Sequence, residues 1–147
     1  MVTFTKELKR IPRGDVPDFV AAAMPQFYEA IGCPNDVILS VQASMAHYST
    51  PKKNVPVEEY EAFEVTLTKK GAFVAVEDIV KDNAIIEAFK PYKTSGKGAY
   101  PFVPAEVIEQ LYLYLKKYSE KPSQSQLCGM WRLFFGDEKD KLFLLNH

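Results

Sequence analysis

The residues best placed to do chemistry in this sequence follow a short apolar stretch. In residues 37–45, apolar side chains alternate with small polar ones, which is the pattern of a half-buried β-strand. A solvated strand face usually carries Lys, Glu or Thr, whereas small hydrogen-bonding groups suit the wall of a binding site. Two other interpretations stay open, namely an ordinary polar strand face and a helix over residues 36–48. The polar set consists of Ser40, Gln42 and Ser44, followed by His47, Tyr48, Ser49 and Thr50.

A second group of candidate residues comes from residues 91–102, a loop rich in glycine, lysine and aromatic residues. Together with residues 47–53, it offers rings that can stack on a base and ammonium groups that can neutralise a phosphate. The alternative is core packing for the rings and a plain surface loop for the rest. The candidates are Tyr48, Lys52, Lys53, Tyr92, Lys93, Lys97, Tyr100 and Phe102. Arg132 is a further candidate phosphate ligand, or else an ordinary outward-facing arginine.

Affinity sets a condition on such a site. Stacking contributes about 1–3 kcal/mol per base, whereas nanomolar binding requires about 12 kcal/mol. One ring and one lysine therefore cannot suffice, and the pocket must be closed on several sides. We expect a site that lies between subunits or beneath a loop.

Motifs for phosphate-loop and nucleophilic chemistry are incomplete. Around Lys97, Pro91 and Gly98 occupy positions where a phosphate-binding loop needs a glycine and a hydroxyl residue. The run from His47 to Ser49 resembles half of a two-histidine phosphodiesterase signature, but the only other histidine is His147. No strand-turn-helix elbow presents a nucleophilic serine. We therefore expect no catalytic residues, and a small nucleotide-processing enzyme with His47 as acid or base stays the alternative.

Composition and charge narrow the class of protein. With 147 residues and a formal charge of −1, the chain is most simply one domain, and its balanced charge disfavours binding to long nucleic acids. No apolar run approaches membrane-spanning length and no signal peptide is evident, so we expect no membrane association and a cytoplasmic location. Cys33 and Cys128 lack metal-ligand spacing, and we interpret both as reduced thiols. We expect neither a metal nor a cofactor.

Periodicity and turn residues predict the elements that position these groups. Pro25 is expected to kink or break the first helix. In the first half of the chain we expect an arm or a short edge strand over 1–14, a helix or helix pair over 15–32 that Asp15 caps and Gly32 ends, the strand from residue 37, and a loop over 49–59. In the second half we expect a hairpin over 62–76 with Gly71 in its turn, a short helix before Pro91, the loop over 91–102, a helix over 104–118, a linker over 119–125 and a C-terminal hairpin over 126–147. The predicted fold is a single α+β domain with an antiparallel β-sheet and flanking helices.

Several short motifs in residues 37–115 resemble one family of small phage-borne proteins. They are the runs from Ser40 to Ser44, His47 to Lys52 and Tyr60 to Val65, the pair Pro91-Tyr92, and the run from Tyr100 to Pro104. The chain resembles the first family of Thoeris anti-defence proteins, which sequester cyclic ADP-ribose isomers made by bacterial TIR-domain immune enzymes. Ser49 stands where a cysteine is more readily expected, and lysines stand where arginines would grip phosphate with two donors.

The resemblance implies a protein without catalytic activity that binds cyclic nucleotide signals and releases them intact. It implies a homo-oligomer with pockets between subunits, and some members also take up small cyclic oligonucleotides at a separate site. Carried over residue by residue, it assigns a strand wall of Gln42, Ser44, His47 and Tyr48 and a loop side of Tyr92, Tyr100 and Phe102. The other hypotheses are the nucleotide-processing enzyme and a module that inhibits another protein through its tyrosine-rich helix.

Overall fold

The structure is a computed structural model that describes residues 2–94 and 98–120, without the side chains of 118–120. The helices are η1 (Phe4–Glu7), α1 (Asp18–Ala22), η2 (Val57–Glu59), α2 (Val76–Ile79), α3 (Asn83–Phe89), η3 (Lys90–Tyr92) and α4 (Ala105–Glu120). The strands are β1 (Ile31–Cys33), β2 (Val37–Gln42), β3 (Ala62–Lys69), β4 (Ala72–Phe73) and β5 (Ala99–Pro104). These elements confirm the predicted α+β fold with an antiparallel sheet and flanking helices.

The sheet is built on β2 and β3. β1 pairs with β2, β2 with β3, and the other edge of β3 pairs with β5 along its first part and with β4 at its end. All pairs are antiparallel, and the register aligns Ile31 with Leu39 and Leu39 with Leu67. Because side chains alternate along a strand, this row of buried residues defines the core face of the sheet.

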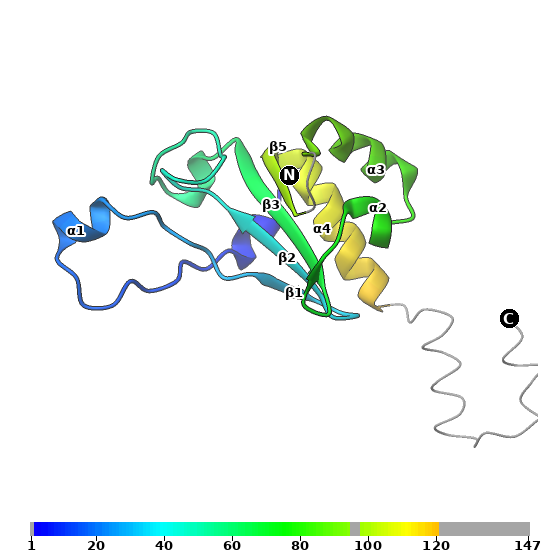
Figure 1. The fold of residues 1–147 in the computed structure, drawn as a ribbon, viewed down its shortest axis with the longest axis horizontal. Coiled ribbons are helices and arrows are strands. Elements are labelled where there is room, and N and C mark those ends of the chain that lie inside the picture. Colours follow the sequence, from blue (N-terminus) through cyan, green and yellow to red (C-terminus); the bar gives the residue numbers. More distant parts are fainter. Residues whose placement is uncertain (1, 95–97, 121–147) are drawn as a thin grey trace, which may run out of the picture.

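Helices α2, α3 and α4 lie on one side of the sheet, as Figure 1 shows. In α4, Ile108, Leu111 and Leu115 are buried at helical spacing, as the sequence predicts. The facing side chains of Val41, Val65 and other core-face residues are fully buried. The opposite face of the sheet carries half-exposed polar residues on β2 and β3.

The N-terminal segment is fastened to α4, although the sequence predicts an arm there. Phe4 in η1 is fully buried and meets Phe63 edge to face with 5.5 Å between ring centroids. The carboxylate of Glu109 accepts hydrogen bonds from the backbone N–H groups of Thr3 (2.8 Å) and Phe4 (3.0 Å) and from the Thr3 hydroxyl. Residues 2–8 are therefore part of the core, because a buried ring and a buried carboxylate hold them.

The predicted helix over 15–32 is wrong for most of its length. Only α1 is helical, with Pro17 rather than Asp15 at its N-cap. Residues 9–11 pair instead with residues 27–29 through Ile11 N to Phe27 O (2.8 Å) and Glu29 N to Lys9 O (2.8 Å). Residues 8–30 thus form an extended arm, paired between residues 9–11 and 27–29, that projects from the sheet with α1 at its tip (Figure 1). Pro25 opposes helix continuation, and strand pairing takes over after it.

Gln26 anchors the base of this arm. Its side chain is 1% exposed, and its Nε2 lies 2.7 Å from Tyr60 Oη, 3.0 Å from the Val55 carbonyl oxygen and 3.1 Å from Tyr28 Oη. A buried amide with these partners ties the arm to the loop over 43–61.

Two further elements differ from the sequence predictions. Residues 99–104 are strand β5 rather than loop, because Phe63, Val65 and Thr66 supply an edge for pairing. The short helix before Pro91 is split into α2 and α3 by an extended residue, Val80. The strand from residue 37 and the hairpin with Gly71 at φ +83° are confirmed. The predicted linker and C-terminal hairpin, with Cys128 and Arg132, lie outside the described residues.

Candidate functional site

The candidate site begins in the tight turn that follows β2. Ser44 Oγ accepts hydrogen bonds from the N–H groups of Ala46 (3.0 Å) and His47 (3.2 Å) and lies 2.6 Å from His47 Nδ1. Ser49 is buried, and its hydroxyl accepts a bond from the Ser44 N–H (3.3 Å). These short-range bonds are how serines shape turns. They fix the direction in which His47 and Tyr48 leave the sheet.

His47 sits half-buried against the arm. Its ring meets that of Phe27 edge to face, with 5.0 Å between centroids. Burial lowers the pKa of His47, and the nearby Glu64 carboxylate only partly opposes this effect. Since Ser44 Oγ already accepts two N–H groups, its own proton points to Nδ1, so the ring is neutral with its proton on Nε2. His47 is therefore a neutral ring at pH 7.

Tyr48, which follows His47 in the turn, forms an exposed pair of rings with Phe102. Tyr48 is 52% and Phe102 45% exposed, and their centroids are 5.7 Å apart. Lys52 Nζ lies 5.0 Å from the centre of the Tyr48 ring, within range of a cation–π contact. We name Phe27, His47, Tyr48, Lys52 and Phe102 the aromatic site.

Hydrogen bonds from the backbone N–H groups of both residues hold these two rings in place. Phe102 N donates to the Tyr48 carbonyl oxygen (3.0 Å), and Tyr48 N donates to Glu64 Oε1 (3.0 Å). Phe102 has φ +54° at an irregularity in the pairing of β3 with β5. A bulky residue with positive φ is uncommon and marks a position that its surroundings over-determine.

The Ser44 and His47 pair has the spacing of a nucleophile and its base, yet Ser44 cannot be reached. Its side chain is fully buried and its oxygen already accepts two backbone N–H groups. An activated serine needs access to its substrate. We interpret this hydrogen bond as part of the turn.

Several predicted site residues are used by the protein itself. Gln42 bridges to the arm, with Oε1 accepting from Tyr28 N (2.8 Å) and Nε2 donating to Tyr28 O (2.8 Å). Tyr100 is buried, and its hydroxyl accepts from Val76 N (2.9 Å). With Ser44, these residues hold elements together, and we leave them out of the proposed binding surface.

Tyr92 and Lys93 lie with the short helices rather than with the aromatic site. Tyr92 is half-buried against the core, and Lys93 forms an ion pair with Glu77 of α2. The structure therefore separates the predicted strand wall from much of the predicted loop side. Only Phe102 of that side joins His47 and Tyr48. Lys97 and Arg132 lie outside the described residues.

Sequence reasoning missed Phe27 and Glu64 as members of this region. The sequence analysis expects Phe27 on the buried side of a helix, but Phe27 lies on the exposed arm. The available signal was Pro25, which opposes a helix that continues to residue 27. Glu64 reaches the turn because the register pairs it with Gln42. That register depends on the contact of two strands and has no local signature.

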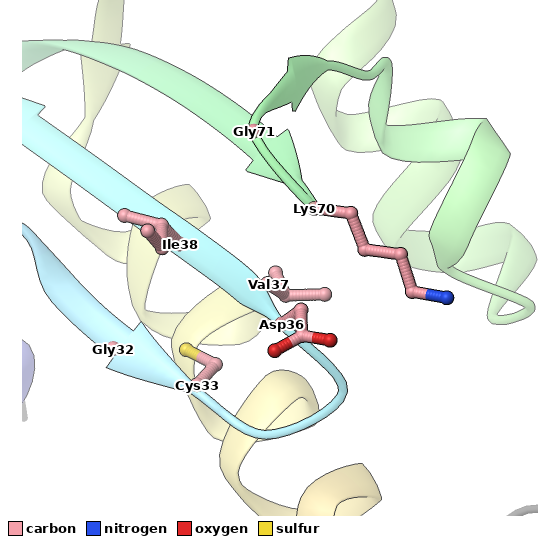
Figure 2. A pocket seen from close by; sticks show the side chains of 7 residues that line it. All are labelled: Gly32, Cys33, Asp36, Val37, Ile38, Lys70 and Gly71. Atoms are coloured by element: carbon pink, nitrogen blue, oxygen red, sulfur yellow. The ribbon is translucent and has the colours of Figure 1, made fainter.

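A hollow of about 410 Å³ lies at the end of the sheet where β1 turns into β2 and β3 into β4. Figure 2 shows its lining, with the Lys70 side chain extending away from the other residues. It lies apart from the aromatic site. Among the described residues, no group of three or more His, Cys, Asp or Glu is arranged to hold a metal ion, and none of the helices described is long and apolar enough to cross a membrane.

Comparison with known proteins adds no relative. The chain matches no family model, no curated protein and no solved structure.

Proposed function

We propose that this protein binds and sequesters a small cyclic nucleotide without cleaving it. The observation that carries the proposal is the exposed pair of rings, Tyr48 and Phe102, with the Lys52 ammonium beside it. Exposed rings stack on bases, and an adjacent cation neutralises phosphate. The resemblance of the motifs around His47 and Tyr100 favours cyclic ADP-ribose isomers, and small cyclic oligonucleotides next, as the ligand in a phage-type counter-defence role.

The chemistry of His47 supports binding over turnover. Its neutral ring, with Nδ1 held by Ser44, is suited to donating a hydrogen bond from Nε2. Acid–base cleavage of a phosphodiester commonly uses two groups that exchange protons with the substrate. The nucleotide-processing alternative would have to use His47 with a partner from another part of the chain.

A second copy of the chain is expected to close the site. The aromatic site lies on an open surface, and one face of stacking falls far short of the roughly 12 kcal/mol that nanomolar capture needs. The arm supplies a surface for association, because α1 has no buried residue and Phe19 is 77% exposed. A different protein on the same arm is the competing occupant.

A thermal-shift screen against nucleotides and cyclic signalling molecules tests the proposal. A ligand that binds only the native state raises the free energy of unfolding, by about 2.7 kcal/mol when its concentration is a hundred times Kd. The melting temperature rises as a result. We expect the largest shift for a cyclic ADP-ribose isomer and none when Tyr48 and Phe102 are both replaced. Shifts for no compound on the panel would contradict the proposal.

A further inference from the structure

We infer that the open end of the sheet is a docking surface for the protein's own C-terminal segment. This inference goes beyond the proposed ligand and does not rest on it. The surface is one row of residues that the register places on the face opposite the helices. The row runs through Gly32, Ile38, Thr68 and Phe73.

Two large apolar side chains of this row are uncovered in the described part of the chain, and the half-buried Thr68 lies between them. Ile38 is 42% and Phe73 56% exposed. The hollow of about 410 Å³ is lined by Ile38 together with Gly32, Cys33 and four residues at the turns, namely Asp36, Val37, Lys70 and Gly71. Ile38 is the exposed apolar side chain at this hollow, and Phe73 lies two strands away in the same row. Exposed apolar groups gathered on one face mark an interaction site.

The chain leaves α4 at the end of the sheet where this row lies, but on the face that the helices cover. Lys116 Nζ lies 3.4 Å from the Gly32 carbonyl oxygen, and α4 ends one turn later at Glu120. Figure 1 shows the end of α4 beside the turns of the sheet, and in Figure 2 the same helix passes behind β1 and β2. The C-terminal segment therefore starts at the same end of the sheet as the surface that we assign to it.

The composition of that segment fits the surface. Residues 121–147 are rich in large apolar residues, which need a partner surface to leave water. The large apolar residues are Leu127, Met130, Trp131, Leu133, Phe134, Phe135, Leu142, Phe143, Leu144 and Leu145. The ten residues between Glu120 and Trp131 span up to about 33 Å when extended, and adjacent strands lie only about 4.8 Å apart. The linker is therefore long enough to bring Trp131 to this surface.

Tethering favours the chain's own segment over a free partner. A short linker gives the attached segment an effective concentration in the millimolar range. A separate protein or a second copy at micromolar concentration is about a thousand times more dilute than the attached segment, so it competes weakly for the same surface.

Trp131 is the only tryptophan, so its fluorescence reports on the segment directly. In the full chain we expect emission at shorter wavelength than in denaturant, unchanged on dilution. Ile38→Lys should shift it towards the denatured value, and Ile38→Thr, which keeps the β-branched shape, should shift it part of the way. Leu113→Lys, at a 52% exposed position on α4, is the matched control and should leave it unchanged.

Each contrary result overturns the inference. Native emission equal to that in denaturant would show no docking. A shift with Leu113→Lys but not with either Ile38 variant would place the segment on α4. Return to the denatured value on dilution would show that the segment of a second copy, not the chain's own, occupies the surface. Circular dichroism of each variant identifies any loss of fold. If Ile38→Lys is unfolded, the emission of Ile38→Thr decides whether the segment docks at Ile38.

Discussion

The backbone conformations of Tyr48 and Phe102 differ, and this difference decides which residue can replace each ring without disturbing the fold. Tyr48 Cα sits in a turn fixed by Ser44 and Ser49, whereas Phe102 has φ +54°. Glycine adopts positive φ without steric cost. Replacement of the Phe102 ring therefore need not disturb the fold if glycine takes its place.

We predict that Tyr48→Ala and Phe102→Gly each weaken ligand binding while leaving the melting temperature of the free protein nearly unchanged. Each ring is about half exposed, and loss of one stacking contact costs about 1–3 kcal/mol, or roughly 5- to 150-fold in Kd. Calorimetric titration measures the effect. Leu113→Ala removes an equally exposed apolar side chain on α4 and should leave Kd unchanged. Equal weakening by all three variants would contradict the assignment.

The second prediction at the residue scale concerns pH. Burial lowers the pKa of His47 below its ordinary 6.5, so the unfolded chain binds a proton more readily than the native one. Stability should be complete above pH 6.5 and fall as the pH drops through the native pKa, with a slope of at most about 1.4 kcal/mol per pH unit for this group. His47→Asn keeps an acceptor for Ser44 and should abolish this contribution in urea titrations. An identical pH profile for both proteins would refute it.

At the scale of elements, the N-terminal segment depends on one carboxylate of α4. Burial of Glu109 opposes its ionisation, but the hydrogen bonds from Thr3 and Phe4 outweigh this effect and lower its pKa below 4.5. Burial and the Glu7 carboxylate raise the pKa of Tyr112 to about 12 on the same surface. Two carboxylates thus join η1 to α4.

We predict that Glu109→Gln lowers stability by about 1–3 kcal/mol, because an amide oxygen replaces a charged acceptor of three hydrogen bonds. The Glu109 contribution is present above pH 4.5 and is lost as the pH falls through the lower native pKa, so the variant should also lose acid sensitivity in that range. Denaturant titration at several pH values measures both. Glu106→Gln, at an exposed position of α4, is the control, and an equal loss there would contradict the account.

Local patterns predicted some elements and failed for others. The strand from Val37 and the helix ending near Glu120 each have a complete period of buried residues, so periodicity identified them. Phe19, Val20 and Phe27 also have helical spacing, yet pairing of residues 9–11 with 27–29 decides the structure. Such pairing joins distant residues and leaves no local pattern.

Only part of the candidate site was predicted, because strand pairing also decides which of its residues come together. His47, Tyr48 and Phe102 stand out by residue type and are brought together. Tyr100 and Phe102 are two residues apart and would share one face of a regular strand, but the irregularity in the pairing of β5 at Phe102 puts one ring in the core and leaves the other exposed. Burial of Tyr100 corresponds to the core-packing alternative, and the sequence has no local signal for the irregularity that decides between the two rings.

At the scale of the whole molecule, the arm is the least covered part of the described chain. α1 has no buried residue, and the arm's base is fastened by Gln26. A rigidly anchored apolar tip of this kind is suited to intermolecular contact.

We predict that Phe19→Asp lowers the oligomeric state in sedimentation velocity without lowering the melting temperature of the monomer, since Phe19 is 77% exposed. Leu113→Asp changes an exposed apolar side chain on α4, outside the arm, and is the control. A wild-type protein that is monomeric at all concentrations, with and without ligand, would contradict association of like copies. The arm would then be assigned to a different protein.

Recovery of the bound ligand distinguishes sequestration from cleavage. A cyclic ADP-ribose isomer is dialysed to equilibrium against excess protein, the protein is then denatured by heat, and the released material is identified by mass spectrometry. We predict retention on the protein side and quantitative recovery of the intact cyclic molecule at every incubation time. Recovery of a hydrolysed product that increases with time and protein would contradict sequestration and favour an enzyme.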